Sequence, residues 1–226
     1  MIYKTFISYA GADSNTAQLI HDSLGRINLI LPYKAENYPN FAEEFKQRIQ
    51  REIIDSVFMI ALLTENGKNS QFVNQEIGFA KAVKACNLQY KFNPKNKDLP
   101  IIIPISQKNV DLKGLITKDS DDILFLDNYP SLELVIADII LVLRAMIPKG
   151  LEDNSLTVNA TCPYCFDEVK ELGYLPESET LKALIKRNEK LTAACPKCKK
   201  VISLDARTLL PLNDKPEENK HTHVLI

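Results

Sequence analysis

The sequence lacks both a charge excess of either sign and a long uninterrupted hydrophobic run. Its 226 residues carry 28 lysines and arginines against 29 aspartates and glutamates, a formal net charge of -1. No global field therefore attracts nucleic acid or an anionic membrane, and partners must be recognised locally. The longest apolar stretch, 132–147, is interrupted by Glu133, Asp138 and Arg144. These charges argue against a bilayer-spanning helix, so we expect no membrane contact of that kind.

The sequence also lacks the features of a secretory signal, an internal repeat and a low-complexity tract. Its N-terminal segment enters a strand-like run at once, without a basic start, an apolar stretch and a small-residue cleavage site. Five cysteines fit a reducing compartment, because four form two Cys-x-x-Cys pairs and Cys86 stands alone. We therefore expect a cytoplasmic protein in which Cys86 is a core residue.

Residues 1–148 alternate short apolar runs with longer amphipathic stretches, which is typical of an α/β fold with a parallel sheet. The expected strands are residues 3–9, 29–31, 57–63, 99–105 and 123–126. Four helices are expected. The first covers residues 15–24, and the second begins after its cap Asn40 and has apolar residues recurring to Ile53. The third covers 71–86 with Ser70 as its cap, and the fourth covers 131–147. Five strands separated by helices predict a flavodoxin-like sheet, whose ligands bind beyond the carboxyl ends of the strands.

The rest of the chain divides by composition. Glu, Asp, Asn and Ser dominate from the Pro-Lys-Gly at 148–150 to residue 155, which predicts a linker over 149–158. A second, smaller module is expected over 159–211. The remaining segment, 212–226, is polar and is expected to be a flexible tail.

Two Cys-x-x-Cys pairs dominate the second module. Cys162 and Cys165 are separated by 29 residues from Cys195 and Cys198. Four thiolates at this spacing suit a tetrahedral Zn²⁺ ion, and a complete set of four leaves no open position for a substrate, so we predict structural zinc in a zinc-ribbon-like domain. Two disulfides or a redox dithiol are the alternatives, but the first does not suit a reducing compartment and the second needs one pair. The long spacer predicts an inserted helix within 178–191.

Seven basic residues between Lys182 and Lys200 are opposed only by Glu189. The stretch contains no aromatic residue, so we interpret it as a solvated face and do not expect a nucleic-acid partner. A zinc module that reads nucleic acid is the alternative, and it would show binding that weakens steeply with salt.

One carboxylate stands out in the expected helix 71–86. At 100° per residue the apolar side chains fill one arc: Phe72, Val73, Ile77, Phe79, Ala80 and Val83. Glu76 falls near the centre of that arc, where it loses hydration unless it has a partner or lines a wet cavity. Periodicity alone leaves two interpretations open, a structural carboxylate that caps a loop or joins a buried ion pair, and a functional one.

Two segments resemble motifs of the Toll/interleukin receptor (TIR) domain family. Phe6-Ile7-Ser8-Tyr9 followed by Asp13 resembles the first motif, and residues 70–76 resemble the family's Ser-x-Trp-Val-x-x-Glu segment. The order of elements matches as well, so the resemblance covers about two thirds of the chain. It implies a TIR domain over 1–148 and identifies Glu76 with the catalytic glutamate of the NAD-consuming members.

The resemblance further implies which residues line an NAD pocket: Ser8, Tyr9, Lys34, Phe41 and Phe72. Phe41 could instead be only helix core, and Lys34 only a solvated loop charge. The sequence departs from the family at Phe72, where the family usually has Trp, and so loses an indole donor. The loop 32–39 also lacks the usual Asp and Pro-Gly, which bears on nucleotide contacts, subunit contacts and the product isomer.

The activity implied by the resemblance is that of an NAD⁺ nucleosidase, a hydrolase that forms linear or cyclic ADP-ribose products in a self-associated TIR domain. One carboxylate can serve, because nicotinamide departs neutral while positive charge develops on the ribose. A prokaryote-like effector in signalling or immunity would use this chemistry. The alternative is a non-enzymatic signalling scaffold that acts through homotypic TIR contacts.

Overall fold

A computed structural model describes residues 2–34, 42–90, 99–112, 116, 123–147, 156–212 and 222–224 of the chain. The chain divides into two compact units. The first, called the sheet unit here, comprises residues 2–21 and 31–130. The second, called the cysteine unit, comprises residues 22–30 and 131–226 together with Met1. Asn40 and Phe41, predicted as a helix cap and a pocket residue, lie outside the described residues.

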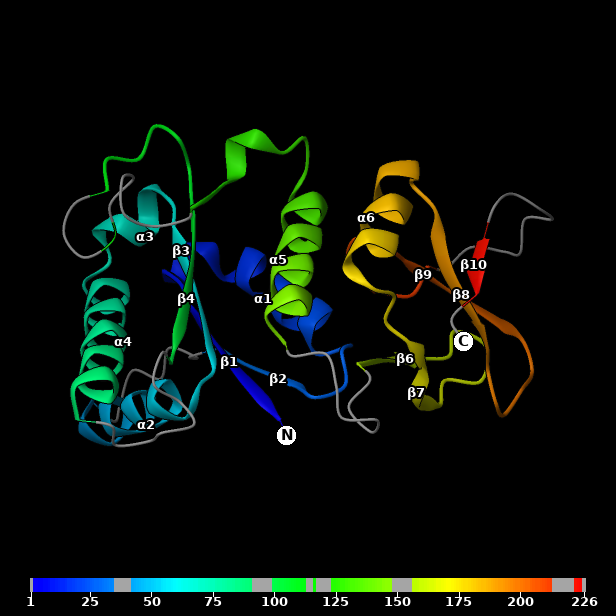
Figure 1. The fold of residues 1–226 in the computed structure, drawn as a ribbon, viewed down its shortest axis with the longest axis horizontal. Helices are drawn as coiled ribbons and strands as arrows, with labels where there is room; N and C mark the ends of the chain where they lie inside the picture. Colours follow the sequence, from blue (N-terminus) through cyan, green and yellow to red (C-terminus); the bar gives the residue numbers. More distant parts are fainter. Residues whose placement is uncertain are drawn as a thin grey trace. The chain divides into compact units, whose positions relative to one another are not determined.

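The sheet unit is built on a five-stranded parallel sheet, as predicted (Figure 1). Its strands are β1 (Tyr3–Ser8), β2 (Ile30–Lys34), β3 (Phe58–Leu63), β4 (Ile101–Ser106) and β5 (Leu124–Phe125). They lie in the order β2-β1-β3-β4-β5, with Ser8 of β1 opposite Ala61 of β3. This is the flavodoxin-like order, in which β2 lies on one side of β1 and strands β3 to β5 lie on the other.

Helices connect these strands. They are η1 (Gly11–Asp13), α1 (Ser14–Leu24), α2 (Ala42–Asp55), α3 (Glu65–Asn69), α4 (Gln71–Tyr90) and the short η2 (Leu126–Asn128). The sequence predicts α1, α2 and α4 but not α3. Thr64 caps α3, because its hydroxyl accepts hydrogen bonds from the amides of Asn66 and Gly67. A Cβ at Gly67 would lie 2.0 Å from the Leu62 carbonyl oxygen, so only glycine fits there.

Strand β2 continues three residues beyond its predicted end at Leu31. Tyr33 explains the extension, because its ring stacks on Phe6 of the neighbouring strand at a centroid distance of 5.8 Å. The guanidinium of Arg48 on α2 lies 5.7 Å from the same ring, as in a cation–π contact. Packing across strands therefore fixes the end of β2, and the local sequence pattern does not contain that information.

The core of the sheet unit lies between the sheet and two helices. Strand β3 is buried throughout, and it packs with Ile49 and Ile53 of α2 and with Val73 and Ile77 of α4. The predicted apolar arc of α4 is confirmed at Val73, Ile77 and Ala80. Phe72, also placed on that arc, is 57% exposed.

Cys86 is exposed as well, so its prediction as a core residue is wrong. Nine residues at 100° each place Cys86 directly opposite Ile77 on the helix. The periodicity that identifies the buried face of α4 therefore also accounts for the exposure of this cysteine.

The cysteine unit contains two β-hairpin-like pairs. Strands β6 (Thr157–Thr161) and β7 (Glu168–Tyr174) are antiparallel, as are β8 (Lys190–Ala194) and β9 (Val201–Asp205). Helix α6 (Ser178–Arg187) separates β7 from β8 and is the predicted inserted helix. Strand β10 (Thr222–Val224) pairs in parallel with β8 and lies within the expected tail, where the sequence predicts no strand.

This unit also contains α5 (Leu132–Met146) and the turn between α1 and β2. Helix α5 packs against α6. Ile27 in the turn forms an antiparallel bridge with Val158 of β6. On either side of that bridge, the Asn28 amide donates to the Thr157 carbonyl at 2.7 Å and the Asn159 amide donates to the Arg26 carbonyl at 2.6 Å. The β6–β7 pair is thus hydrogen bonded to the turn that precedes β2.

None of the helices in the described part of the chain is both long enough and apolar enough to cross a bilayer.

Candidate functional site

Glu76 is joined to the end of the first strand. Ser8 is the last residue of β1, and its hydroxyl donates a hydrogen bond of 2.5 Å to Oε2 of Glu76 on α4. Both side chains are buried, with exposed fractions of 1% for Ser8 and 9% for Glu76. The pair lies at the carboxyl end of β1, where the strand order reverses, and ligands of such sheets bind at this point.

Burial raises the pKa of the Glu76 carboxyl to about 7, and the hydrogen bond from Ser8 lowers it in part. No ion pair among the described residues involves Glu76. Its contact with a hydroxyl does not match the buried ion pair that the sequence leaves open as a structural explanation. A carboxylate poised near neutral pH in this way is typical of functional sites.

A hollow open to solvent lies beside Glu76 between α2 and α4. Its described lining residues come from these two helices: Lys46, Ile49, Gln50, Ile53, Phe72, Gln75, Glu76 and Phe79. The hollow therefore combines one buried carboxylate, two aromatic rings, amide groups and an exposed lysine. Such a mixture of apolar walls and a few polar groups is typical of small-molecule sites.

The predicted pocket residues are not all brought to this hollow. Phe72 and Glu76 line it, and Ser8 reaches it through its bond to Glu76. Tyr9 and Lys34 are half-buried and are not among the described lining residues. The sequence analysis did not identify Lys46, Gln50 and Gln75. The first two are four residues apart on α2, a spacing that places them on one helix face and could have suggested them.

Asp13, part of the first motif, holds the neighbouring loop. Its carboxylate accepts hydrogen bonds from the Thr64 hydroxyl at 2.7 Å and from the Asn66 side-chain amide at 3.2 Å. Thr64 directly follows β3, so this contact joins the segments that follow β1 and β3. The first motif therefore supplies both Ser8, bonded to the candidate carboxylate, and Asp13, which orders an adjacent loop.

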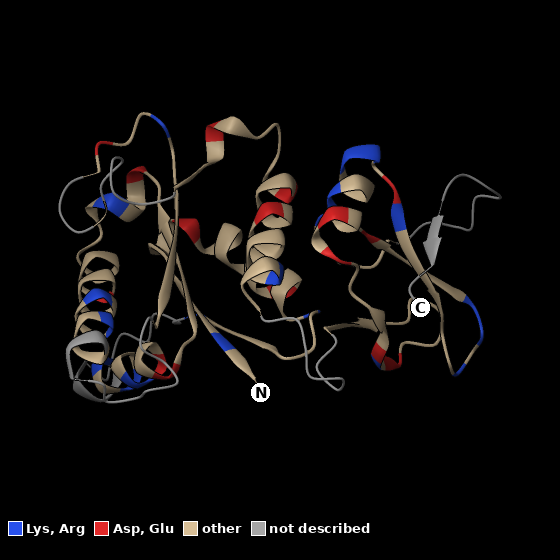
Figure 2. Cartoon of the chain, in the orientation of Figure 1, with Lys and Arg blue, Asp and Glu red and all other residues tan. Residues whose placement is uncertain are grey.

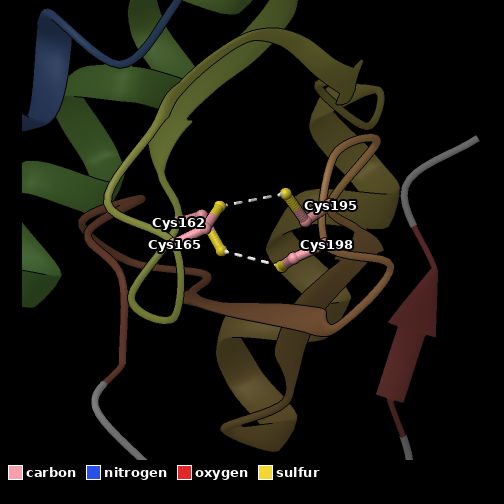
Figure 3. Close-up of side chains that lie close together, drawn as sticks. All are labelled: Cys162, Cys165, Cys195 and Cys198. Carbon is pink, nitrogen blue, oxygen red and sulfur yellow. Dashed lines mark hydrogen bonds between the residues drawn. The ribbon is translucent and has the colours of Figure 1, made fainter.

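The four paired cysteines form one cluster in the cysteine unit (Figure 3). Their sulfurs all lie within 4.8 Å of one another, with 3.6 Å between Cys162 and Cys198 and 3.8 Å between Cys165 and Cys195. A tetrahedral zinc ion with bonds of about 2.3 Å would place its sulfurs about 3.8 Å apart. The cluster therefore has the size and donor set of a four-thiolate metal site.

The two cysteine turns share one backbone geometry. In the first, the Phe166 amide donates to the Cys162 carbonyl at 2.9 Å, and in the second the Lys199 amide donates to the Cys195 carbonyl at 2.9 Å. Phe166 and Lys199 both have positive φ, at 59° and 62°. All four cysteines are free, which argues against the disulfide alternative. Two matched turns that each present two sulfurs can together hold a metal ion.

The basic stretch between Lys182 and Lys200 is spread over separate elements. Its charges fall on α6, on the start of β8 and on the turn between β8 and β9 (Figure 2). Within this stretch, Lys197 pairs with Asp167 at 2.6 Å and Arg187 pairs with Glu189 at 3.7 Å. This distribution supports the interpretation as a solvated face.

Comparison with known families decides the identity of the first part of the chain. The model of the TIR domain family matches residues 5–123, just over half of the sequence. The chain belongs to the TIR domain family. The matched range contains Ser8, Asp13 and Glu76 and ends before the cysteine cluster. A comparison with curated proteins finds no match.

Proposed function

We propose that the TIR domain cleaves the bond between nicotinamide and ribose in NAD⁺, with Glu76 as the catalytic carboxylate. The observation that carries this proposal is the burial of Glu76 beside an open hollow with a hydroxyl, and no cation among the described residues, as its partner. Burying an ionisable carboxylate without a counter-charge destabilises a fold. A domain that only makes contacts has no need of such a group.

The chemistry requires a negative charge beside the ribose. When the C1′–N bond breaks, its electron pair leaves with nicotinamide, which becomes neutral, and positive charge develops on C1′ and the ring oxygen. The Glu76 carboxylate, hydrogen bonded to ribose hydroxyls, stabilises that charge within a largely buried site. Water then adds to C1′ and releases a proton, which gives ADP-ribose. A nucleophile of the same molecule that attacks instead gives a cyclic product.

The hollow presents groups that a dinucleotide can contact. The exposed ring of Phe72 and the half-buried ring of Phe79 can stack on a base, and Lys46 can pair with phosphate. The cationic nicotinamide ring beside Glu76 would favour the ionised carboxylate, because an opposite charge nearby lowers its pKa. Tyr9, Lys34 and Phe41 stay predictions of the family resemblance.

For the cysteine unit we propose one structural Zn²⁺ held by Cys162, Cys165, Cys195 and Cys198. The ion would fix the two cysteine turns, and four thiolates leave it no position for a substrate. We further propose a TIR domain over 1–148, a linker over 149–158, a zinc ribbon over 159–211 and a tail over 212–226. The full chain would act as a self-associating cytoplasmic effector in signalling or immunity.

The competing function is a scaffold that signals through homotypic contacts, since TIR domains generally interact in this way. Incubation of concentrated protein with NAD⁺ separates the two, with nicotinamide release followed for the wild type and for Glu76→Ala. Release by the wild type and its loss in the variant are expected. No release by concentrated, self-associated protein would favour the scaffold.

Metal analysis of protein purified under reducing conditions tests the zinc proposal separately. One equivalent of zinc per chain is expected, and Cys198→Ser should bind far less. Well under one equivalent in unoxidised wild type would contradict the proposal.

A further inference from the structure

We propose that Ser8 is a positioning residue for Glu76. The Ser8 hydroxyl fixes one oxygen of the Glu76 carboxylate and favours the charged form of that carboxylate. This inference rests on the proposed catalytic function of Glu76. The resemblance places Ser8 among residues that line a nucleotide pocket. The structure instead engages its hydroxyl with Glu76.

The geometry gives the two carboxylate oxygens different tasks. Oε2 accepts the Ser8 hydroxyl at 2.5 Å, a short distance typical of a hydrogen bond to a charged acceptor. Oε1 accepts no hydrogen bond from the described residues, and Glu76 also lines the hollow. Ser8 thus holds one oxygen while the other is available to a ribose hydroxyl. Holding the carboxylate in one orientation contributes to catalysis, because the group need not reorganise during the reaction.

The charged groups around Glu76 leave Ser8 as its main polar partner. Lys46 on α2 lines the same hollow and is exposed. Strand β3 contributes no titratable side chain.

Ion pairs and hydrogen bonds engage several of the other charges on the neighbouring elements. On β1, Lys4 pairs with Asp55, and on α3 Glu65 pairs with Lys68 at 2.9 Å. Asp13, beyond the end of β1, accepts its hydrogen bonds from Thr64 and Asn66. Burial raises the pKa of Glu76, and the Ser8 hydroxyl is the main group that lowers it. Removing this hydroxyl should therefore raise the pKa further.

Ser106 provides a matched comparison within the same sheet. It is the last residue of β4, as Ser8 is of β1, and it is equally buried. Its hydroxyl donates to the backbone carbonyl of Leu63 at 3.0 Å, so its partner is a backbone group and not a carboxylate. A Ser106→Ala variant removes a buried strand-end hydroxyl without touching the carboxylate.

The test is the pH profile of kcat/KM for nicotinamide release from NAD⁺ by the full chain, between pH 5.5 and 9. The wild type should lose activity below about pH 7, where Glu76 becomes protonated. Ser8→Ala should move this acidic limb of the profile, where activity is lost, to higher pH by about one unit. A hydrogen bond to a charged group shifts a pKa by roughly that amount. The ratio of variant to wild-type activity should then be about tenfold lower at pH 6 than at pH 9, and any loss that remains at pH 9 measures the lost orientation.

Ser106→Ala should keep the wild-type limb. A Ser8→Ala profile that is lowered equally at every pH, with its limb unmoved, would overturn the inference. If Ser8→Ala does not fold, Ser8→Cys keeps the shape with a weaker donor and should shift the limb in the same direction. An unmoved limb in that variant would overturn the inference as well. A wild type without nicotinamide release would instead contradict the proposed function, which is a different result.

Discussion

The Ser8 hydroxyl donates to the Glu76 carboxylate at 2.5 Å although 68 residues separate them in the sequence. The bond joins the last residue of the first strand to the second turn of a helix two strands later. It also joins the two sequence motifs on which the family resemblance rests. One contact therefore gives a physical reason why a strand ending in Ser and a helix carrying Glu belong together in this domain.

Replacing Glu76 by Gln should stabilise the protein at alkaline pH. The folded pKa of Glu76, about 7, lies above the ordinary glutamate value of 4.5, so the folded state binds more protons between these pH values. Stability from this group is fully present below pH 4.5 and falls as the pH rises to about 7. The loss amounts to about 3 kcal/mol, and Glu76→Gln should avoid most of it. Urea unfolding of both proteins from pH 5 to 8 measures the difference.

At pH 5 the two proteins should be similar in stability, because Glu76 is then protonated and resembles the amide. Ser106→Ala serves as the control, and its difference from the wild type should not change with pH. A Glu76→Gln variant that is less stable than the wild type at pH 8 would show that the carboxylate stabilises the fold, as a structural residue would.

Phe72→Ala should weaken substrate binding more than it slows the chemical step. The ring is 57% exposed and lines the hollow, so its removal costs the fold little but removes a surface for base stacking. Stacking contributes about 1–3 kcal/mol per base, which predicts an increase in KM of about 5- to 150-fold. The control is Phe166→Ala, which removes an 80% exposed ring from the cysteine unit. Equal KM values for the wild type and Phe72→Ala would exclude this ring from the binding site.

Metal removal should loosen the turn between α1 and β2. The Asn28 amide donates to Thr157 in β6, and β6 leads into the first cysteine turn. If the metal orders that turn, a chelator under reducing conditions should speed amide exchange at Asn28 and Asn159. Amides between β1 and β3 provide the reference and should stay protected. Unchanged exchange at Asn28 after complete metal loss would show that this turn is ordered without the metal.

Asp13→Ala should destabilise the sheet unit by about 1–3 kcal/mol, because the Thr64 hydroxyl and the Asn66 amide lose their acceptor. The matched control is Asp55→Ala, which breaks an exposed pair with Lys4 and should cost less than about 1 kcal/mol. The free energy of unfolding in urea measures both. Equal losses would contradict the role of Asp13 in ordering the loop after β3.

The sequence was sufficient to predict the sheet and the unusual character of Glu76, for different reasons. Buried runs such as 58–63 and amphipathic helices repeat at periods that are visible in the sequence. Helical phase alone places Glu76 beside Val73 and Ile77, and the structure confirms its burial. The spacing of the four cysteines likewise predicts that they meet, and their sulfurs do cluster.

Features set by distant contacts could not be predicted in this way. The extension of β2 depends on Tyr33 stacking on Phe6, and α3 depends on a close approach of Gly67 to Leu62. The bridge between Ile27 and Val158 joins segments far apart in the chain. Phe72 shows a further limit, since an aromatic residue near an apolar arc can be exposed beside a hollow.

The most direct test of the central claim compares nicotinamide release by the wild type, Glu76→Gln and Cys86→Ala, with concentrated protein at pH 8. Glu76→Gln keeps the shape of the side chain and removes its charge, whereas Cys86→Ala alters an exposed residue ten positions farther along the same helix. We expect Glu76→Gln to lower the rate about 100- to 1000-fold and Cys86→Ala to leave it unchanged. A Glu76→Gln variant that folds and releases nicotinamide at the wild-type rate would contradict the assignment of Glu76 as the catalytic residue.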